Sequence, residues 1–117
     1  YYGSLVYYSD KNQFVNNILD NNLYGISNVY SDESTFIGNE FTNQQYGLFI
    51  YKSDNTIVKE NSAKNNRFGS LIFYSKGNTI HGNEFVENGI YGLYFYNAHD
   101  TNFTNNVVMK SNYGLKM

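Results

Sequence analysis

An aromatic residue followed by glycine recurs at an almost constant spacing along the whole chain. The pairs are Tyr2-Gly3, Tyr24-Gly25, Tyr46-Gly47, Phe68-Gly69, Tyr91-Gly92 and Tyr113-Gly114. Each pair lies 22 residues after the one before it, except for one step of 23. A fixed period of this size is typical of a repeat protein, in which each unit stacks on its neighbours. With the aromatic residue as position 1, the units are 2–23, 24–45, 46–67, 68–90 and 91–112, followed by a partial unit, 113–117.

Apolar residues alternate within each unit as they do in a β-strand. Leu48 and Ile50 are two residues apart, as are Leu93 and Phe95, and this is the period of a strand and not the 3.6-residue period of a helix. We predict three short strands per unit, around positions 3 to 7, 12 to 14 and 17 to 19, separated by polar or glycine-containing turns. The predicted fold is therefore all-β: a right-handed parallel β-helix of about five coils, stacked at about 4.8 Å.

Two columns keep one residue type in every complete unit. Glycine at position 2 predicts either a turn with positive φ or a close approach of two backbones, because glycine tolerates both. Asparagine at position 16 predicts a ladder of amide hydrogen bonds that passes from coil to coil. The ladder residues are Asn17, Asn39, Asn61, Asn83 and Asn106. We interpret both columns as architecture and not as ligand sites.

The composition excludes several classes of partner. A net charge of −2 makes an electrostatic attraction to nucleic acid or to an anionic membrane unexpected. Thirteen tyrosines and nine phenylalanines argue against disorder, because disordered chains are poor in aromatic residues. The chain has no cysteine for a disulfide or a thiolate metal site, and no run of 18 apolar residues that would span a membrane. We expect neither a nucleic-acid partner nor a membrane span.

The outward positions of the first strand are also rich in apolar residues. If positions 3 and 5 face the core, positions 4 and 6 face outward, and a wetted face would carry polar residues there. Three interpretations stay open: a tyrosine-rich surface half wetted by its hydroxyls, packing against another subunit or segment, and stacking of sugar rings. The candidate binding residues are Tyr7, Phe49, Tyr51, Leu71, Phe73, Tyr94 and Tyr96.

Acidic residues at position 9 of the first three units are the candidate metal column. Asp10, Asp32 and Asp54 lie one coil apart, at about 5 Å, where carboxylates can share a Ca²⁺ ion. Aspartate is also an ordinary turn residue, so we interpret the column as a solvated turn. The two histidines, His81 and His99, have no cysteine beside them to complete a zinc or copper site. We therefore expect no metal, no cofactor and no catalytic residue.

Three strings within the repeats are Tyr46-Gly47-Leu48, Asn78-Thr79-Ile80-His81-Gly82-Asn83 and Tyr91-Gly92-Leu93. They resemble a known family, the parallel β-helix repeats of NosD-like proteins and of carbohydrate-binding and sugar-hydrolase (CASH) domains. Such repeats occur in archaeal and bacterial surface proteins, adhesin-like proteins, polysaccharide lyases and epimerases, so the resemblance implies an exported protein more than a reaction. The copper handling of NosD is not supported by the residues present here.

The repeat extends to both ends of the chain. It opens at Tyr2-Gly3 and stops inside a sixth first strand at Tyr113-Gly114, with no amphipathic cap on either side. An uncapped coil exposes backbone groups that pair readily with another strand. We therefore expect a segment of a longer protein or fibre that associates with itself, or with neighbouring β-helix coils, end to end or laterally.

These observations favour an extracellular or cell-surface scaffold with a structural or adhesive role, able to form filaments. Polysaccharide recognition on the outward aromatic residues is the first alternative, with a polysaccharide as partner. A fragment of a polysaccharide lyase or hydrolase that uses the aspartate column is the second. Nearly equal coils with short turns offer no long loops to wall a catalytic groove, so an enzyme is the less favoured interpretation.

Overall fold

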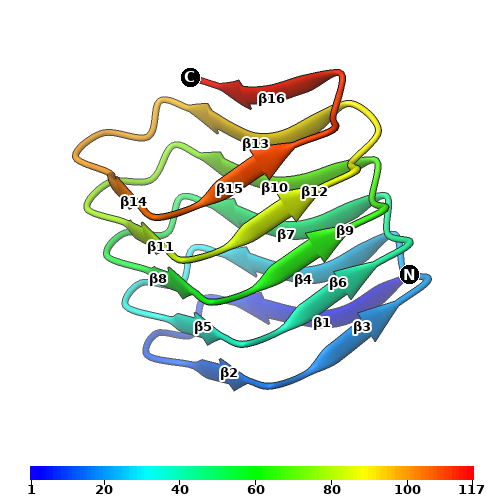
Figure 1. The fold of residues 1–117 in the computed structure, drawn as a ribbon. Coiled ribbons are helices and arrows are strands. Elements are labelled where there is room, and N and C mark those ends of the chain that lie inside the picture. The colour runs from blue at the N-terminus through cyan, green and yellow to red at the C-terminus, as the bar shows by residue number, and fades with distance from the viewer.

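Sixteen parallel strands and no helix make up the structure of residues 1–117, a computed structural model (Figure 1). The chain winds through five full coils, from the N-terminus at one end of the stack to the C-terminus at the other. Every strand pairs with the corresponding strand of the coil before or after it. The predicted parallel β-solenoid is confirmed. Nowhere does the chain form a helix that could traverse a lipid bilayer.

Three sheets form the sides of the stack. The long sheet contains β1 (Tyr2–Tyr7), β4 (Tyr24–Val29), β7 (Tyr46–Tyr51), β10 (Phe68–Phe73), β13 (Tyr91–Tyr96) and β16 (Tyr113–Lys116). The second sheet contains β2 (Gln13–Val15), β5 (Thr35–Ile37), β8 (Ile57–Lys59), β11 (Thr79–His81) and β14 (Asn102–Thr104). The third sheet contains β3 (Ile18–Asp20), β6 (Glu40–Thr42), β9 (Ser62–Lys64), β12 (Glu84–Val86) and β15 (Val107–Met109).

The strands of the second and third sheets occupy the predicted positions, whereas the strands of the long sheet begin two residues earlier than predicted. The aromatic residue at position 1 already pairs with its counterpart, as Tyr24 does with Tyr46. The register is constant along the stack. The one longer coil keeps it, because Phe68 still pairs with Tyr91 and the extra residue is taken up in the turn before β13.

The hydrophobic core is a set of columns that run along the inside of the stack. Its twelve fully buried members come from positions 3, 5, 13 and 18, which the strand alternation points inward. They are Ile26, Phe36, Phe41, Leu48, Ile50, Val58, Ala63, Ile72, Ile80, Phe85, Leu93 and Phe95. Three inward positions carry polar residues instead, Ser4, Asn28 and Ser70, and the last two are buried.

Truncating an inward ring should destabilise the stack far more than truncating an outward chain. We expect Phe85→Ala to lower the free energy of unfolding by about 3 kcal/mol, because Phe85 is only 2% exposed and a cavity would remain. Lys76→Ala should cost under about 0.5 kcal/mol, since its side chain is exposed. A urea titration of both variants measures the difference. Equal, small losses would be incompatible with the inward register.

The glycine column is explained by a close approach of backbones and not by positive φ. A Cβ built on Gly25 would lie 2.5 Å from the carbonyl oxygen of Gly47 in the next coil. Gly47 meets the carbonyl oxygen of Gly69 in the same way, and neither residue has a positive φ. Position 2 is therefore where neighbouring coils come too close for any side chain.

Candidate functional site

The outer surface of the long sheet carries a layer rich in aromatic rings, which we call the outer aromatic face. It consists of positions 1, 4, 6 and 7 of the coils. The rings at position 1 stack from coil to coil, with centroids 4.8 Å apart for Tyr24 and Tyr46 and 5.1 Å apart for Tyr46 and Phe68. Because parallel strands are spaced at about 4.8 Å, identical rings in one column must stack.

Five of the predicted binding residues form one connected cluster on this face. Phe73 is the centre: its ring centroid lies 5.1 Å from that of Tyr94 and 6.0 Å from those of Phe49 and Tyr96. The ring of Tyr51 lies 6.0 Å from that of Phe49. Such aromatic pairs stabilise the face beyond the area that they bury. The rings cover one another only in part, and Tyr96 stays 46% exposed.

The two other predicted binding residues adjoin that cluster, Leu71 between Phe49 and Tyr94 in the sheet and Tyr7 through the ring of Tyr30. Leu71 faces outward as predicted, but the rings around it leave it only 5% exposed, so it supports the face from below. Tyr7 lies two coils away in β1, where its ring contacts Tyr30 at 6.1 Å and remains 58% exposed. The rings at position 1 were not among the predicted binding residues. The presence of an aromatic residue at this position in all six repeats could have indicated them.

A hollow of about 300 Å³ interrupts the face at the second coil. Ser27 and Val29 stand there at positions 4 and 6, where most other coils carry larger side chains. Ser27 forms part of the lining and is itself only 3% exposed. The remaining lining residues are Tyr2, Leu5, Tyr7, Tyr24 and Phe49. The hollow is therefore apolar and walled by aromatic rings.

The charged groups on the face are two lysines, and each lies over aromatic rings. The Nζ atom of Lys52 is 5.5 Å from the ring centroids of both Tyr30 and Tyr51. The Nζ atom of Lys116 lies 5.1 Å from the ring centroid of Tyr94 and donates a hydrogen bond to the Tyr91 hydroxyl. That hydrogen bond raises the pKa of Lys116. Cation–π contacts of this kind hold both ammonium groups at the surface of the face.

Several phenols on the face resist ionisation. Removal from water raises the pKa of Tyr24, and the neighbouring phenols of Tyr46 and Tyr2 raise it further. Loss of hydration is also the main cause of the raised pKa of Tyr8 and of Tyr74. These three phenols therefore stay protonated at neutral pH. Since these pKa values exceed those of the unfolded chain, their contribution to stability is present below about pH 10 and is lost above it.

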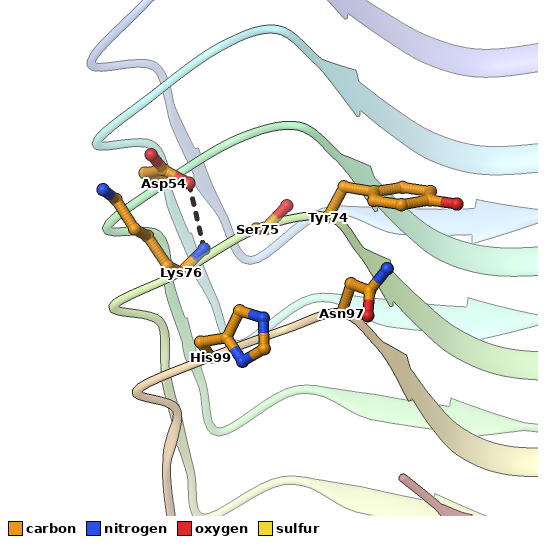
Figure 2. Close-up of a pocket in the computed structure, with 6 residues that line it drawn as sticks. All are labelled: Asp54, Tyr74, Ser75, Lys76, Asn97 and His99. Atoms are coloured by element: carbon orange, nitrogen blue, oxygen red, sulfur yellow. Dashed lines mark hydrogen bonds between the residues drawn. The ribbon is translucent and has the colours of Figure 1, made fainter.

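The candidate metal column forms a hydrogen-bond ladder along the turn that follows the long sheet. Oδ1 of Asp10 accepts the backbone N–H of Asp32 at 2.8 Å, and Oδ1 of Asp32 accepts that of Asp54 at 2.7 Å. Oδ1 of Asp54 accepts the N–H of Lys76 at 2.9 Å (Figure 2). No group of three or more histidine, cysteine or acidic side chains is placed to hold a metal ion. Each carboxylate thus fixes the coil that follows it.

A second, polar hollow of about 450 Å³ lies at the end of this column. The lining includes Lys76 and His99, which replace aspartate at position 9 in the fourth and fifth coils (Figure 2). Tyr74, from position 7 of the outer aromatic face, also lines it. The position-9 column therefore borders the outer aromatic face, and its charge changes from acidic to basic along the stack.

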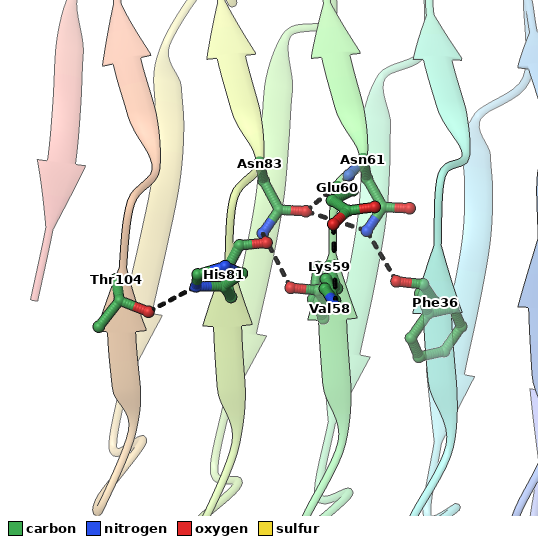
Figure 3. Close-up of polar contacts among 8 residues, drawn as sticks. All are labelled: Phe36, Val58, Lys59, Glu60, Asn61, His81, Asn83 and Thr104. Atoms are coloured by element: carbon green, nitrogen blue, oxygen red, sulfur yellow. Dashed lines mark hydrogen bonds and ion pairs between the residues drawn. The ribbon is translucent and has the colours of Figure 1, made fainter.

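The position-16 asparagines form a continuous ladder inside the turn between the second and third sheets (Figure 3). Oδ1 of Asn61 accepts both the backbone N–H and the side-chain N–H of Asn39, and Asn83 does the same for Asn61. From the second coil onward, Nδ2 of the ladder asparagine also donates to a carbonyl oxygen of the coil before it, as Asn61 does to Phe36 at 2.8 Å. Nδ1 of His81 lies 2.8 Å from the Thr104 hydroxyl, outside this ladder.

Two further ladders were not predicted from the sequence. At position 21, the backbone N–H of Gln44 donates to Asn66, and that of Asn66 donates to Asn88. At position 8, the N–H of Ser31 donates to the Ser53 hydroxyl at 3.0 Å. The ladder at position 21 could have been predicted from the asparagine or glutamine that four of five coils carry there. All these ladders tie neighbouring coils together at the corners of the stack.

One family comparison covers the whole chain. A family model described as a right handed beta helix region matches residues 1–117. No curated protein and no solved structure matches the chain. The family match agrees with the parallel coils. It does not specify a role for the outer aromatic face.

Proposed function

The chain belongs to the right handed beta helix family, and on that premise we propose that it is a rigid structural scaffold that presents the outer aromatic face for adhesive contact. The observation that carries this proposal is the connected ring cluster around Phe73, which is only partly covered by its own neighbours. Half-exposed aromatic rings are the side chains that contribute most at protein contacts. An exposed aromatic patch on a protein surface can mark a site of contact with a partner.

Rigidity is the second element of the proposal. Seventy backbone hydrogen bonds hold the chain, and side-chain ladders at positions 8, 9, 16 and 21 join the coils at their corners. Because each turn is fixed to the next coil, the outer aromatic face cannot bend without breaking several hydrogen bonds at once. A stiff surface loses little conformational entropy when it binds, which favours adhesion.

We place this scaffold outside the cell or on its surface, among NosD-like and CASH-domain β-helix proteins. The strings Tyr46-Gly47-Leu48 and Tyr91-Gly92-Leu93 support that kinship.

The adhesive role can be tested with beads that carry the chain. We expect wild-type beads to bind cell envelopes of the source organism, and beads with the Tyr51→Ser, Phe73→Ser variant to bind about tenfold less, because two anchoring rings are lost. Lys59→Ser, on the second sheet, is the matched control. Binding is read by flow cytometry, and antibody labelling of intact cells checks the location. Equal binding by all three, or labelling only after lysis, would contradict the proposal.

Polysaccharide binding is the second candidate, and the hollow beside Ser27 favours it. The rings of Tyr2 and Tyr24 line the hollow and stack with centroids 5.1 Å apart, and flat rings at an apolar hollow are suited to the apolar face of a sugar. Affinity electrophoresis in gels that contain neutral polysaccharides measures such binding. Retardation that the Tyr24→Ala variant abolishes, with unchanged binding of the beads to envelope protein, would favour this candidate over the first.

A further inference from the structure

We propose that the outer aromatic face is occupied by a second copy of this chain, packed face to face with its coils running in the opposite direction. This inference rests on the proposed contact role of the face and names a contact partner, so that a chain can adhere to another surface only while no second copy covers the face. Six strands spaced at about 4.8 Å, each about six residues of 3.3 Å, give roughly 600 Å² in projection. The projecting rings enlarge this area towards the roughly 800 Å² per partner of a stable interface.

The symmetry of such a dimer fixes which residues meet. Sheets that pack face to face keep their strands nearly aligned, and a two-fold axis along the strand direction does so while it reverses the order of the coils. With the six strands fully overlapped, the second coil faces the fifth coil of the partner, and the third faces the fourth. Each position then lies opposite the same position. For the face to fit a copy of itself, the shape of its second coil must therefore be complementary to the shape of its fifth coil.

The shape of the face meets this requirement. The second coil has the hollow of about 300 Å³ over Ser27 and Val29, whereas the fifth coil carries Tyr94 and Tyr96 at the same two positions. In the antiparallel dimer, Tyr94 of the partner subunit enters the hollow beside Ser27, and the symmetry repeats this contact at the other end. If the coils ran in the same direction, hollow would face hollow and Tyr94 would meet its own copy.

The charges at the edge of the face support the same arrangement. The position-9 column carries Asp10, Asp32 and Asp54 in the first three coils, then Lys76 and His99. Coil reversal places Asp54 opposite Lys76 of the partner subunit and Asp32 opposite His99 of the partner subunit. Only Oδ1 of each of these carboxylates accepts a backbone N–H within the chain, which leaves Oδ2 for the partner. Asp54 and the partner subunit's Lys76 are thus opposite charges at the rim, and such pairs fix the orientation of two surfaces.

Sedimentation velocity of the 117-residue chain tests the proposal through a swap of residues. We expect a dimer for wild type. Ser27→Tyr fills the hollow and Tyr94→Ser removes the ring that enters it, so each single variant should weaken dimerisation at least tenfold. The double variant Ser27→Tyr, Tyr94→Ser exchanges the roles of the second and fifth coils and should restore the dimer. Ser62→Tyr, on the third sheet, is the control and should remain dimeric.

The outcomes separate this inference from the proposed function. A wild-type chain that stays monomeric at high concentration, a double variant that stays monomeric, or an assembly larger than a dimer would overturn it. Circular dichroism and a urea titration check that each variant folds, and if Ser27→Tyr does not fold, Tyr94→Ser alone decides. If a monomeric chain still adheres through Phe73, the adhesive role survives and the dimer does not. If the chain forms the dimer but does not adhere, the dimer survives and the adhesive role does not.

Discussion

Replacing Gly47 by alanine is expected to destabilise the chain by about 5 kcal/mol, or to prevent it from folding, because the new Cβ would overlap the backbone of the next coil. The nearest atom to that Cβ is the carbonyl oxygen of Gly69, with the Cβ of Phe41 at 3.3 Å and Nδ2 of Asn66 at 3.4 Å. A flexible side chain could move aside, but a carbonyl in a paired strand cannot. The coils also cannot separate locally, since the corner ladders hold them at a fixed spacing.

A glycine outside the column provides the control for that prediction. A Cβ on Gly89 would have no heavy atom nearer than 3.8 Å, and its φ is not positive. We expect Gly89→Ala to leave stability unchanged or to raise it by about 0.5 kcal/mol, through the lower entropy of the unfolded chain. Urea titrations followed by circular dichroism compare the two variants. If both glycines tolerate alanine equally, close backbone approach is not the reason for the column.

The coils, and the columns inside them, could be predicted because they follow from spacing alone. A 22-residue period places equivalent residues above one another, and the two-residue alternation decides which of them face inward. Phe36 and Phe41 stand in the middle of two of the predicted three-residue strands, and both are buried. Spacing also placed the asparagines of position 16 in one column, although it could not specify which of their atoms donate and accept.

The aromatic residue at position 1 shows where that alternation fails. Continued back from position 3, the alternation would turn Tyr24 inward, yet its ring lies 5.6 Å from that of Phe49 on the outer aromatic face. The reason is Gly25, whose Cβ would point inward, 2.8 Å from the Phe41 ring. Two consecutive residues, Gly25 and Ile26, therefore face the core, and the residue before them turns outward. Alternation assumes a regular pleat, which a glycine at a close approach can break.

The location of the candidate site could be predicted from the sequence, but its shape could not. Outward aromatic residues marked the face, whereas the hollow beside Ser27 depends on how the rings of the neighbouring coils lean around a small side chain. The aspartate column was expected to lie in a turn, whether it bound a metal ion or was merely solvated. Its hydrogen bonds to the next coil, however, depend on a turn geometry that composition does not reveal. Both features need side-chain directions, which a repeat pattern leaves open.

Removal of one member of the position-16 ladder should have the second largest effect. We expect Asn61→Ala to lower the free energy of unfolding by about 4 kcal/mol. Its Oδ1 accepts two hydrogen bonds from Asn39, and its Nδ2 donates to Phe36 and to Asn83. Asn39 and Asn61 are buried, so water cannot replace these partners, and each buried group left without one costs about 1–3 kcal/mol. Lys64→Ala, on an exposed chain of the same coil, should cost under about 0.5 kcal/mol.

An isosteric change at the same residue separates hydrogen bonding from packing. Asn61→Asp keeps the acceptor for Asn39 but turns a donor into an acceptor opposite the oxygens of Phe36 and Asn83. Burial raises the pKa of the introduced carboxyl above its unfolded value, so the folded state binds its proton more tightly. We therefore expect the loss at pH 7 to shrink as the pH falls from the raised folded pKa to about 4, the unfolded value, because the protonated acid can donate again in the folded state. A pH-independent loss in urea titrations, or a loss under 1 kcal/mol for Asn61→Ala, would mean that the ladder contributes packing alone.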